Sequence, residues 1–120
     1  MQMETELDAA VLAALRELPS PDGRSMVACV AELFAQDAPP LLESMQRAAA
    51  QHDWVALGSA AHALKSYAGN VGATGFMQQL RALEVAAKAG ESDRCLALLV
   101  PIPDTFHAVA VALAKEAACL

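Results

Sequence analysis

The sequence has little of what sheet proteins and nucleic-acid binders need. Aromatic residues make up only 4% of the 120 residues, although 56% are hydrophobic. Alanine and leucine supply most of the remainder, and both favour helices, whereas strands prefer aromatic and β-branched residues. Lysine and arginine number 8 against 14 aspartates and glutamates, which gives a net charge of −6. Without a basic face to neutralise phosphates, the chain is not expected to bind nucleic acid.

Cysteines and long apolar runs are also scarce. The three cysteines, Cys29, Cys95 and Cys119, lie far apart, which excludes a zinc-ligand spacing and argues against a disulfide framework. The apolar stretch 108–114 is much shorter than the roughly 20 residues of a membrane-spanning helix. The acidic start, MQMETELD, is unlike the basic start of a signal peptide. We therefore expect one cytoplasmic domain over residues 1–120, with no membrane segment and no metal site.

Apolar residues recur at helical spacing along the whole chain. Thr5 and Asp8 resemble a capping box before the apolar positions Val11 to Leu18, and Asp53 and Ser92 are the expected N-caps of two later helices. The expected helices cover that first region, about residues 24–36 with a continuation from 37 or 38, 54–68, 73–89 and the last region of the chain. Gly69-Asn70, Gly72 and Gly90 are the expected turn signals. Pro39 and Pro40 are expected to kink or interrupt the second helical region, and Pro101 and Pro103 the last one. Because the connections are short, neighbouring helices should be antiparallel, as in an all-α up-down bundle.

His62 is expected to point away from the core. At about 100° of rotation per residue, the positions within about 60° of His62 carry few large apolar side chains; these positions are Val55, Gly58, Ser59, Lys65, Ser66 and Gly69. Glycine in a helix costs about 1 kcal/mol relative to alanine, so helix stability does not explain the small residues. They would leave the imidazole open to a large partner. The expected access and docking face therefore consists of Gly58, Ser59, Ser66 and Gly69.

Plainer explanations apply to the same residues. An exposed histidine near a lysine is typical of any solvated helix face, and small residues also let a neighbouring helix pack closely. Glu84 on the next helix has two interpretations as well. It is either a carboxylate that accepts a hydrogen bond from the His62 imidazole and orients the ring, or a solvated side chain.

The segment from His62 to Ala73, HALKSYAGNVGA, resembles the phosphoacceptor motif of histidine-containing phosphotransfer (HPt) domains of bacterial multistep phosphorelays and two-component signalling. The family pattern is roughly H-x-L-K, a small residue, and then an aliphatic–glycine pair followed by another small residue. Further matches are Leu33-Phe34 and Asp37-Ala38-Pro39 upstream, and Phe76, Leu80, Leu83-Glu84 and Ala87 downstream. The likeness covers nearly the whole chain.

The resemblance implies a four-helix bundle with an additional N-terminal helix. It implies that Nε2 of His62 accepts a phosphoryl group from a receiver-domain aspartyl phosphate and passes it to another receiver. Lys65 stands at the position of the phosphate-neutralising lysine, and Gly69 at the position whose missing side chain keeps the ring accessible. Ser66 and Tyr67 depart from the usual residues, and Tyr67 is expected to pack at a helix interface with a partner for its hydroxyl.

The expected partners are receiver domains of response regulators and hybrid sensor kinases, and the chain itself is expected to be a monomer. The sequence has no P-loop or kinase glycine-rich loop and no obvious acidic cluster for Mg²⁺. We therefore expect a relay substrate without ATP-dependent kinase activity, with no cofactor of its own and with Mg²⁺ in the partner receiver. Two alternatives remain open: a helical adaptor that binds a receiver or kinase without accepting phosphate, and a self-associating bundle.

Overall fold

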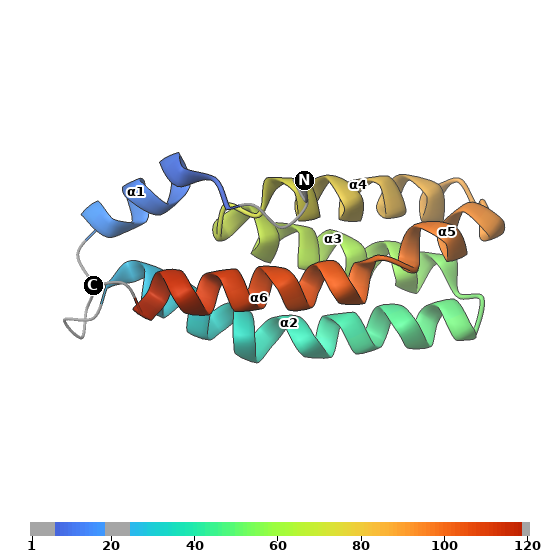
Figure 1. Cartoon of the computed structure of the whole chain (residues 1–120). Helices are drawn as coiled ribbons and strands as arrows, with labels where there is room; N and C mark the ends of the chain where they lie inside the picture. Colours follow the sequence, from blue (N-terminus) through green and yellow to red (C-terminus); the bar gives the residue numbers. More distant parts are fainter. Residues whose placement is uncertain (1–6, 19–24, 119–120) are drawn as a thin grey trace.

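The computed structural model describes residues 7–18 and 25–118, and this part of the chain forms helices joined by short turns, without strands. The helices are α1 (Ala9–Glu17), α2 (Met26–Ala50), α3 (Trp54–Asn70), α4 (Thr74–Lys88), α5 (Ser92–Leu99) and α6 (Ile102–Ala118). The long helices α2, α3, α4 and α6 run up and down in chain order, and α1 lies at one end (Figure 1). The predicted four-helix bundle with an additional N-terminal helix is confirmed.

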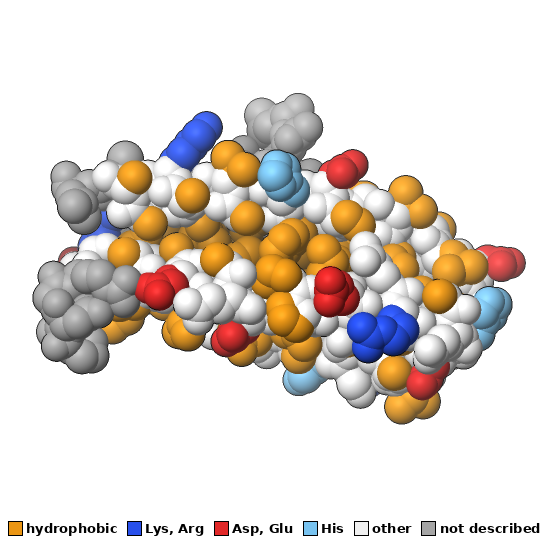
Figure 2. Space-filling view, turned by 90° about the horizontal axis from the view of Figure 1, so that it is seen from below, with side chains coloured by type: hydrophobic (Ala, Val, Ile, Leu, Met, Phe, Trp, Pro, Cys, Tyr) orange, Lys and Arg blue, Asp and Glu red, His pale blue; other side chains and the backbone are white. Residues whose placement is uncertain are grey.

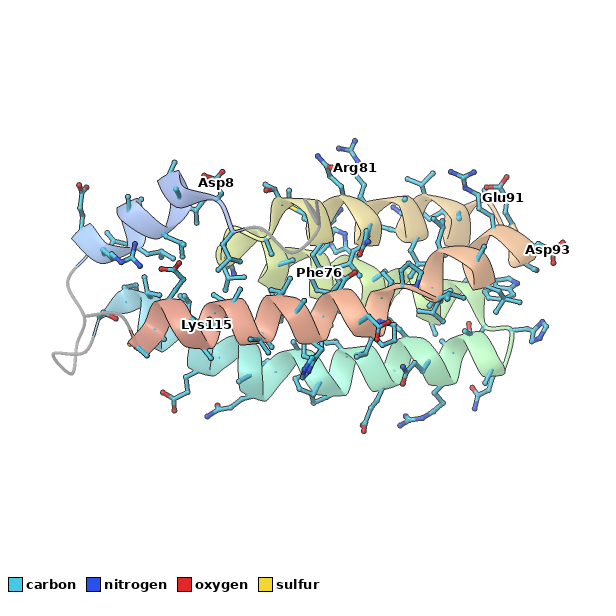
Figure 3. The ribbon with its side chains drawn as sticks, in the orientation of Figure 1. Asp8, Phe76, Arg81, Glu91, Asp93 and Lys115 are labelled. Atoms are coloured by element: carbon cyan, nitrogen blue, oxygen red, sulfur yellow. The ribbon has the colours of Figure 1, made fainter. Side chains whose placement is uncertain are left out.

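The core lies where α3 packs on α2 and α4, with which it has its most extensive contacts. Leu57 and Leu64 on the inner side of α3 are fully buried, and burial of such a side chain contributes about 1.5–3 kcal/mol. The ring of Phe106 on α6 lies 5.4 Å from that of Phe34 on α2 and 6.5 Å from that of Phe76 on α4, centroid to centroid. Phe76 points into the interior of the bundle in Figure 3. The packing of α3 against α2 and α4 covers one side of α3 and leaves its opposite side to solvent.

Three helices end in the same hydrogen-bonded turn, which requires a left-handed residue just after the helix. At the end of α3 this residue is Gly72, with φ of 76°, and at the end of α4 it is Gly90, with φ of 69°. Glycine suits the position because it has no Cβ. After α2 the same position holds His52, with φ of 54°. His52 is thus the exception among three equivalent turns.

The helix α2 continues without a break through Pro39 and Pro40, so the predicted interruption there is wrong. Each proline leaves the carbonyl four residues upstream without its usual donor. Those carbonyls belong to Ala35 and Gln36, which are both exposed. Water can satisfy them, and the helix therefore continues. In the last helical region the predicted break is present, because Pro101 lies between α5 and α6.

Three other helix ends differ from the prediction. At the start of α1 the N-cap is Asp8, whose carboxylate accepts a hydrogen bond from the Ala10 N–H at 2.9 Å, and the predicted capping-box residue Thr5 lies outside the described residues. The helix α3 runs through Gly69 to Asn70, and its turn comes only at Gly72. Ser92 is the first residue of α5 and not its cap, and the cap residue Glu91 makes no side-chain capping bond. The predicted cap of α3 is confirmed, because the Asp53 carboxylate accepts a hydrogen bond from the Ala56 N–H at 3.1 Å.

The helical run from Ser92 to Ala118 is long and apolar enough to cross a membrane by length and composition. The same run supplies four fully buried core side chains, Cys95, Ile102, Val109 and Leu113. A core helix of a bundle passes the same test, so one such run is weak support for a membrane span. The absence of a membrane segment stays a prediction.

An apolar groove lies on the surface between α2 and α6. A groove of about 320 Å³ there is lined by Ala28, Ala31, Glu32, Phe34, Ala35, Ala110, Leu113, Ala114 and Ala117. Seen from the side of α2, a band of apolar side chains runs along the long axis of the molecule (Figure 2). Small apolar side chains thus dominate this side of the bundle.

Candidate functional site

His62 lies in the middle of α3 on the side facing away from the core, and its side chain is 63% exposed. Its Nδ1 atom lies 2.9 Å from Oε2 of Glu84, which comes from α4. Within the described part of the chain, no hydrogen bond to Nε2 is found. The orientation of His62 on the helix agrees with the periodicity, since Leu57 and Leu64 on the opposite side are buried.

Glu84 is a buried carboxylate at the centre of a charge cluster formed with His62, Lys65 and Lys88. It is only 6% exposed, so the interpretation of Glu84 as a solvated side chain is wrong. Lys65 Nζ donates a hydrogen bond to Glu84 Oε1 at 2.7 Å, and Lys88 Nζ lies 3.4 Å from Oε2. The hydrogen bond from Lys65, with smaller contributions from His62 and Lys88, outweighs burial and lowers the pKa of Glu84 from 4.5 to about 2. The carboxylate is therefore ionised at neutral pH.

An ionised Glu84 determines the tautomer of His62. A carboxylate without a proton only accepts hydrogen bonds, so the short contact requires the imidazole proton to be on Nδ1. In the neutral ring Nε2 then carries a free lone pair. The charge cluster thus presents a nucleophilic nitrogen at an exposed position, held in orientation by a buried acid.

A groove of about 530 Å³ opens beside His62, between α3 and the C-terminal half of α4. Its lining residues are Trp54, Val55, Gly58, Ser59, His62, Glu84, Ala87 and Lys88. Val55 is 83% exposed, an unusual environment for a large apolar side chain. At Gly58 an added Cβ would lie 3.4 Å from the Cβ of Ala87, so α4 covers this position.

The four small residues of the predicted docking face fall into two pairs. Ser59 and Ser66 are exposed on α3, and the Ser66 hydroxyl donates to the His62 carbonyl at 3.4 Å. Gly58 and Gly69 instead face α4, where a Cβ at Gly69 would lie 3.2 Å from Met77 Sδ. The two glycines therefore fit the alternative in which small residues let a neighbouring helix pack closely.

Tyr67 lies on the α2 side of α3, away from the imidazole. Its hydroxyl donates a hydrogen bond to Asp37 Oδ2 at 3.0 Å, which raises the pKa of the phenol. The predicted partner for this hydroxyl is therefore present, and Tyr67 does not cover His62.

Several groove residues could not be found from periodicity alone. Trp54 and Val55 begin α3, whereas Ala87 and Lys88 end α4, and the groove forms only when the two helices pack antiparallel. The spacing of four residues between Glu84 and Lys88 was the one available signal, because it places two side chains on the same side of a helix. Arg81 extends from α4 into solvent, and the acidic Glu91 and Asp93 lie at the α4–α5 end of the bundle, just beyond the C-terminus of α4 (Figure 3).

Comparisons with known proteins identify the family. A family model described as the Hpt domain matches residues 30–115, a range that contains the whole charge cluster. The chain belongs to the Hpt domain family. It is also similar to the crystal structure of histidine-containing phosphotransfer protein B (HptB) from Pseudomonas aeruginosa PAO1, with 29% identity and a TM-score of 0.83. The match covers 92% of this chain and 93% of that chain. No curated protein gives a significant match.

Membership gives this Hpt domain a role in phosphorelay histidine phosphotransfer and in two-component signalling. Hpt domains interact with receiver domains in phosphorelays, so the predicted class of partner is confirmed. Among the described residues, no group of three or more histidines, cysteines, aspartates or glutamates lies close enough to hold a metal ion.

Proposed function

We propose that this Hpt domain is a phosphorelay intermediate in which Nε2 of His62 accepts a phosphoryl group from a receiver-domain aspartyl phosphate and passes it to another receiver. The observation that carries the proposal is the hydrogen bond of 2.9 Å between His62 Nδ1 and Glu84. It leaves the Nε2 lone pair on a ring that is 63% exposed, where a second protein can reach it.

In the first transfer the Nε2 lone pair forms an N–P bond while the bond between phosphorus and the aspartyl oxygen breaks. The electrons of the broken bond return to the receiver's carboxylate. The imidazole keeps its Nδ1 proton and becomes cationic. Glu84 already faces this nitrogen as an anion, and a preorganised charge of opposite sign stabilises the charge that develops. Transfer to the second receiver reverses these bond changes.

Lys65 is the proposed partner of the phosphoryl oxygens. In the free protein its ammonium pairs with Glu84 at 2.7 Å, and the side chain is 24% exposed. A small rotation of the flexible lysine stem turns the ammonium toward a phosphoryl group on Nε2. Lys88, at 3.4 Å from Oε2, keeps a cation beside Glu84 when Lys65 turns away.

The remaining chemistry is assigned to the partner. The receiver supplies Mg²⁺ and the acidic pocket that holds its aspartyl phosphate, and this chain acts as a substrate of the transfer without using ATP. The exposed Ser59 and Ser66 belong to the proposed docking face, together with the groove beside His62, which Gly58 helps to line. A cytoplasmic location and a monomeric state are part of the same proposal.

Phosphoryl transfer from a charged receiver, measured by intact mass, tests the proposal. A receiver charged with a small phosphodonor and Mg²⁺ is mixed with wild type, with His62→Gln and with His107→Gln, a control at an exposed histidine of α6. We expect an acid-labile, alkali-stable gain of one phosphoryl group in wild type and in His107→Gln, and none in His62→Gln. The His62 variant should keep its fold, because the ring is exposed.

Two results contradict the proposal. Phosphorylation of His62→Gln would move the acceptor to another residue. Binding to several receivers without any mass gain would instead favour the alternative in which the protein is an adaptor that accepts no phosphoryl group.

A further inference from the structure

His52 occupies a backbone position that the chain twice gives to glycine. In the turn after α2, the His52 N–H donates to the Ala49 carbonyl at 3.1 Å and the Asp53 N–H donates to the Ala48 carbonyl at 2.9 Å. The turn after α4 has the same two bonds, with Gly90 in the place of His52. A side chain in the left-handed conformation is disfavoured because its Cβ crowds the backbone. The turn itself therefore gives no reason for a histidine.

The side chain of His52 contacts a residue of the groove beside His62. Its ring centroid lies 5.4 Å from that of Trp54, with an angle of 50° between the two planes. Trp54 is half-buried at the start of α3 and lines the groove. His52 is exposed, so this contact is not part of the core. The left-handed residue thus places its imidazole against an indole that lines the groove.

We propose that His52 is a positioning residue for receiver docking: its ring holds the Trp54 indole in place as part of the groove lining, and the groove takes an apolar side chain of the receiver domain. The proposal rests on the function proposed above, because a receiver that brings an aspartyl phosphate to Nε2 must cover the groove that His62 lines. The new element is His52, which lies away from the reacting nitrogen and acts through its contact with Trp54.

The chemistry of the groove fits this occupant. Its rim combines Val55, which is 83% exposed, with Lys88, which is 75% exposed. An apolar contact beside a cation matches a partner surface in which an apolar side chain lies next to an acidic pocket. Aromatic side chains in such a contact carry a large share of the binding energy, so the position of Trp54 should affect affinity.

The fluorescence of Trp54 gives a direct readout of the His52 contact, since the chain has 1 tryptophan. His52→Gly removes the ring and leaves a residue that suits the turn, so its thermal midpoint should equal or exceed that of wild type. We expect lower fluorescence anisotropy of Trp54 and a KM for the charged receiver that is higher by about two- to tenfold. The transfer rate at saturating receiver should not change. His52→Tyr, which keeps an aromatic ring, should restore both values.

Gly90→His is the matched control, because it places a histidine in the equivalent turn of α4, where an added Cβ meets nothing within 4 Å. It should lower stability and leave the receiver KM unchanged. An unchanged Trp54 signal in His52→Gly overturns the proposal, as does a changed signal with an unchanged KM. An equal rise of KM in Gly90→His would reduce the effect to general destabilisation and overturn it as well.

Failure of the proposed function has a different signature. If wild type accepts no phosphoryl group from any charged receiver, the function is wrong, and the docking role of His52 falls with it. If wild type accepts the group and His52→Gly does so with the same KM, only the role of His52 is overturned.

Discussion

Two antiparallel helix pairs of this bundle border a groove, and their side chains differ. Between α2 and α6 the lining is apolar and mostly alanine, with Glu32 as the one charged residue. Between α3 and α4, a buried carboxylate is surrounded by His62, Lys65 and Lys88. Apolar packing therefore dominates the contact between α2 and α6. An ionised carboxylate is costly to bury unless it is paired, and because one partner of Glu84 is the ring of His62, the charge cluster orients that ring as well as satisfying the buried charge.

A core substitution in the α2–α6 region tests whether that region contributes to stability and not to phosphoryl transfer. Leu113 on α6 is fully buried and lines the α2–α6 groove. Leu113→Ala should lower the free energy of unfolding by about 2–4 kcal/mol through lost burial and a residual cavity. Urea unfolding measures this loss. Phosphoryl transfer by the folded fraction should keep its wild-type rate, and a slower transfer would show that the two regions are not independent.

Removal of the Glu84 charge tests the contribution of the α3–α4 region to phosphoryl transfer. Glu84→Gln keeps an oxygen that can accept the Nδ1 hydrogen bond but removes the anion. We expect single-turnover transfer to slow by about 10- to 100-fold, or about 1.4–2.7 kcal/mol. Glu32→Gln neutralises the acid of the α2–α6 groove and is the matched control, for which we expect no change. Equal rates in wild type and Glu84→Gln would remove the carboxylate from the mechanism.

The pairing of Glu84 also makes the free energy of unfolding depend on pH. The pKa of Glu84 is lowered in the folded protein to about 2 from 4.5, so its pairing stabilises the fold fully above pH 4.5. This contribution is lost as the pH falls toward 2. After allowance for solvent around its exposed partners, we expect about 1–2 kcal/mol. Urea unfolding at several pH values should show the loss between pH 4.5 and 2 in wild type and a smaller one in Glu84→Gln; identical profiles would contradict the pairing.

The smallest effects should separate the two lysines. Lys65→Ala should slow transfer or shorten the phosphohistidine lifetime by about tenfold, because one charge-assisted contact to the phosphoryl group is lost. Lys88→Ala should have an effect of about two- to threefold, since a largely exposed cation contributes little. Both values come from the decay of the phosphorylated protein and from single-turnover transfer. If Lys88→Ala had a larger effect than Lys65→Ala, Lys88 and not Lys65 would be the partner of the phosphoryl oxygens.

The difference between the two regions also shows what the sequence could predict. Local signals sufficed for most of the helices and for the cap at Asp53, and periodicity sufficed to place His62 outside the core. The contact between His62 and Glu84 was one of two interpretations, because it depends on the register between α3 and α4. That register depends on where α3 ends, and the helix continues through Gly69 to Asn70, beyond the predicted end at residue 68.

Other features of the structure could not be predicted from the local sequence. The groove beside His62 forms only between two packed helices. The left-handed backbone of His52 is hidden because glycine is the usual residue in that turn. The continuity of α2 through Pro39 depends on whether the freed carbonyl faces solvent, which is a property of the packed bundle.

The central claim is that Glu84 holds the proton on Nδ1 of His62 and leaves Nε2 to take the phosphoryl group. The most direct measurement is nitrogen-15 NMR of the His62 ring, with phosphorus-31 coupling, before and after charging by a receiver. We predict a protonated Nδ1 and an unprotonated Nε2 in the free protein, and phosphorus bonded to Nε2 after transfer. A proton on Nε2 in the free protein, or phosphorus on Nδ1, would contradict the claim.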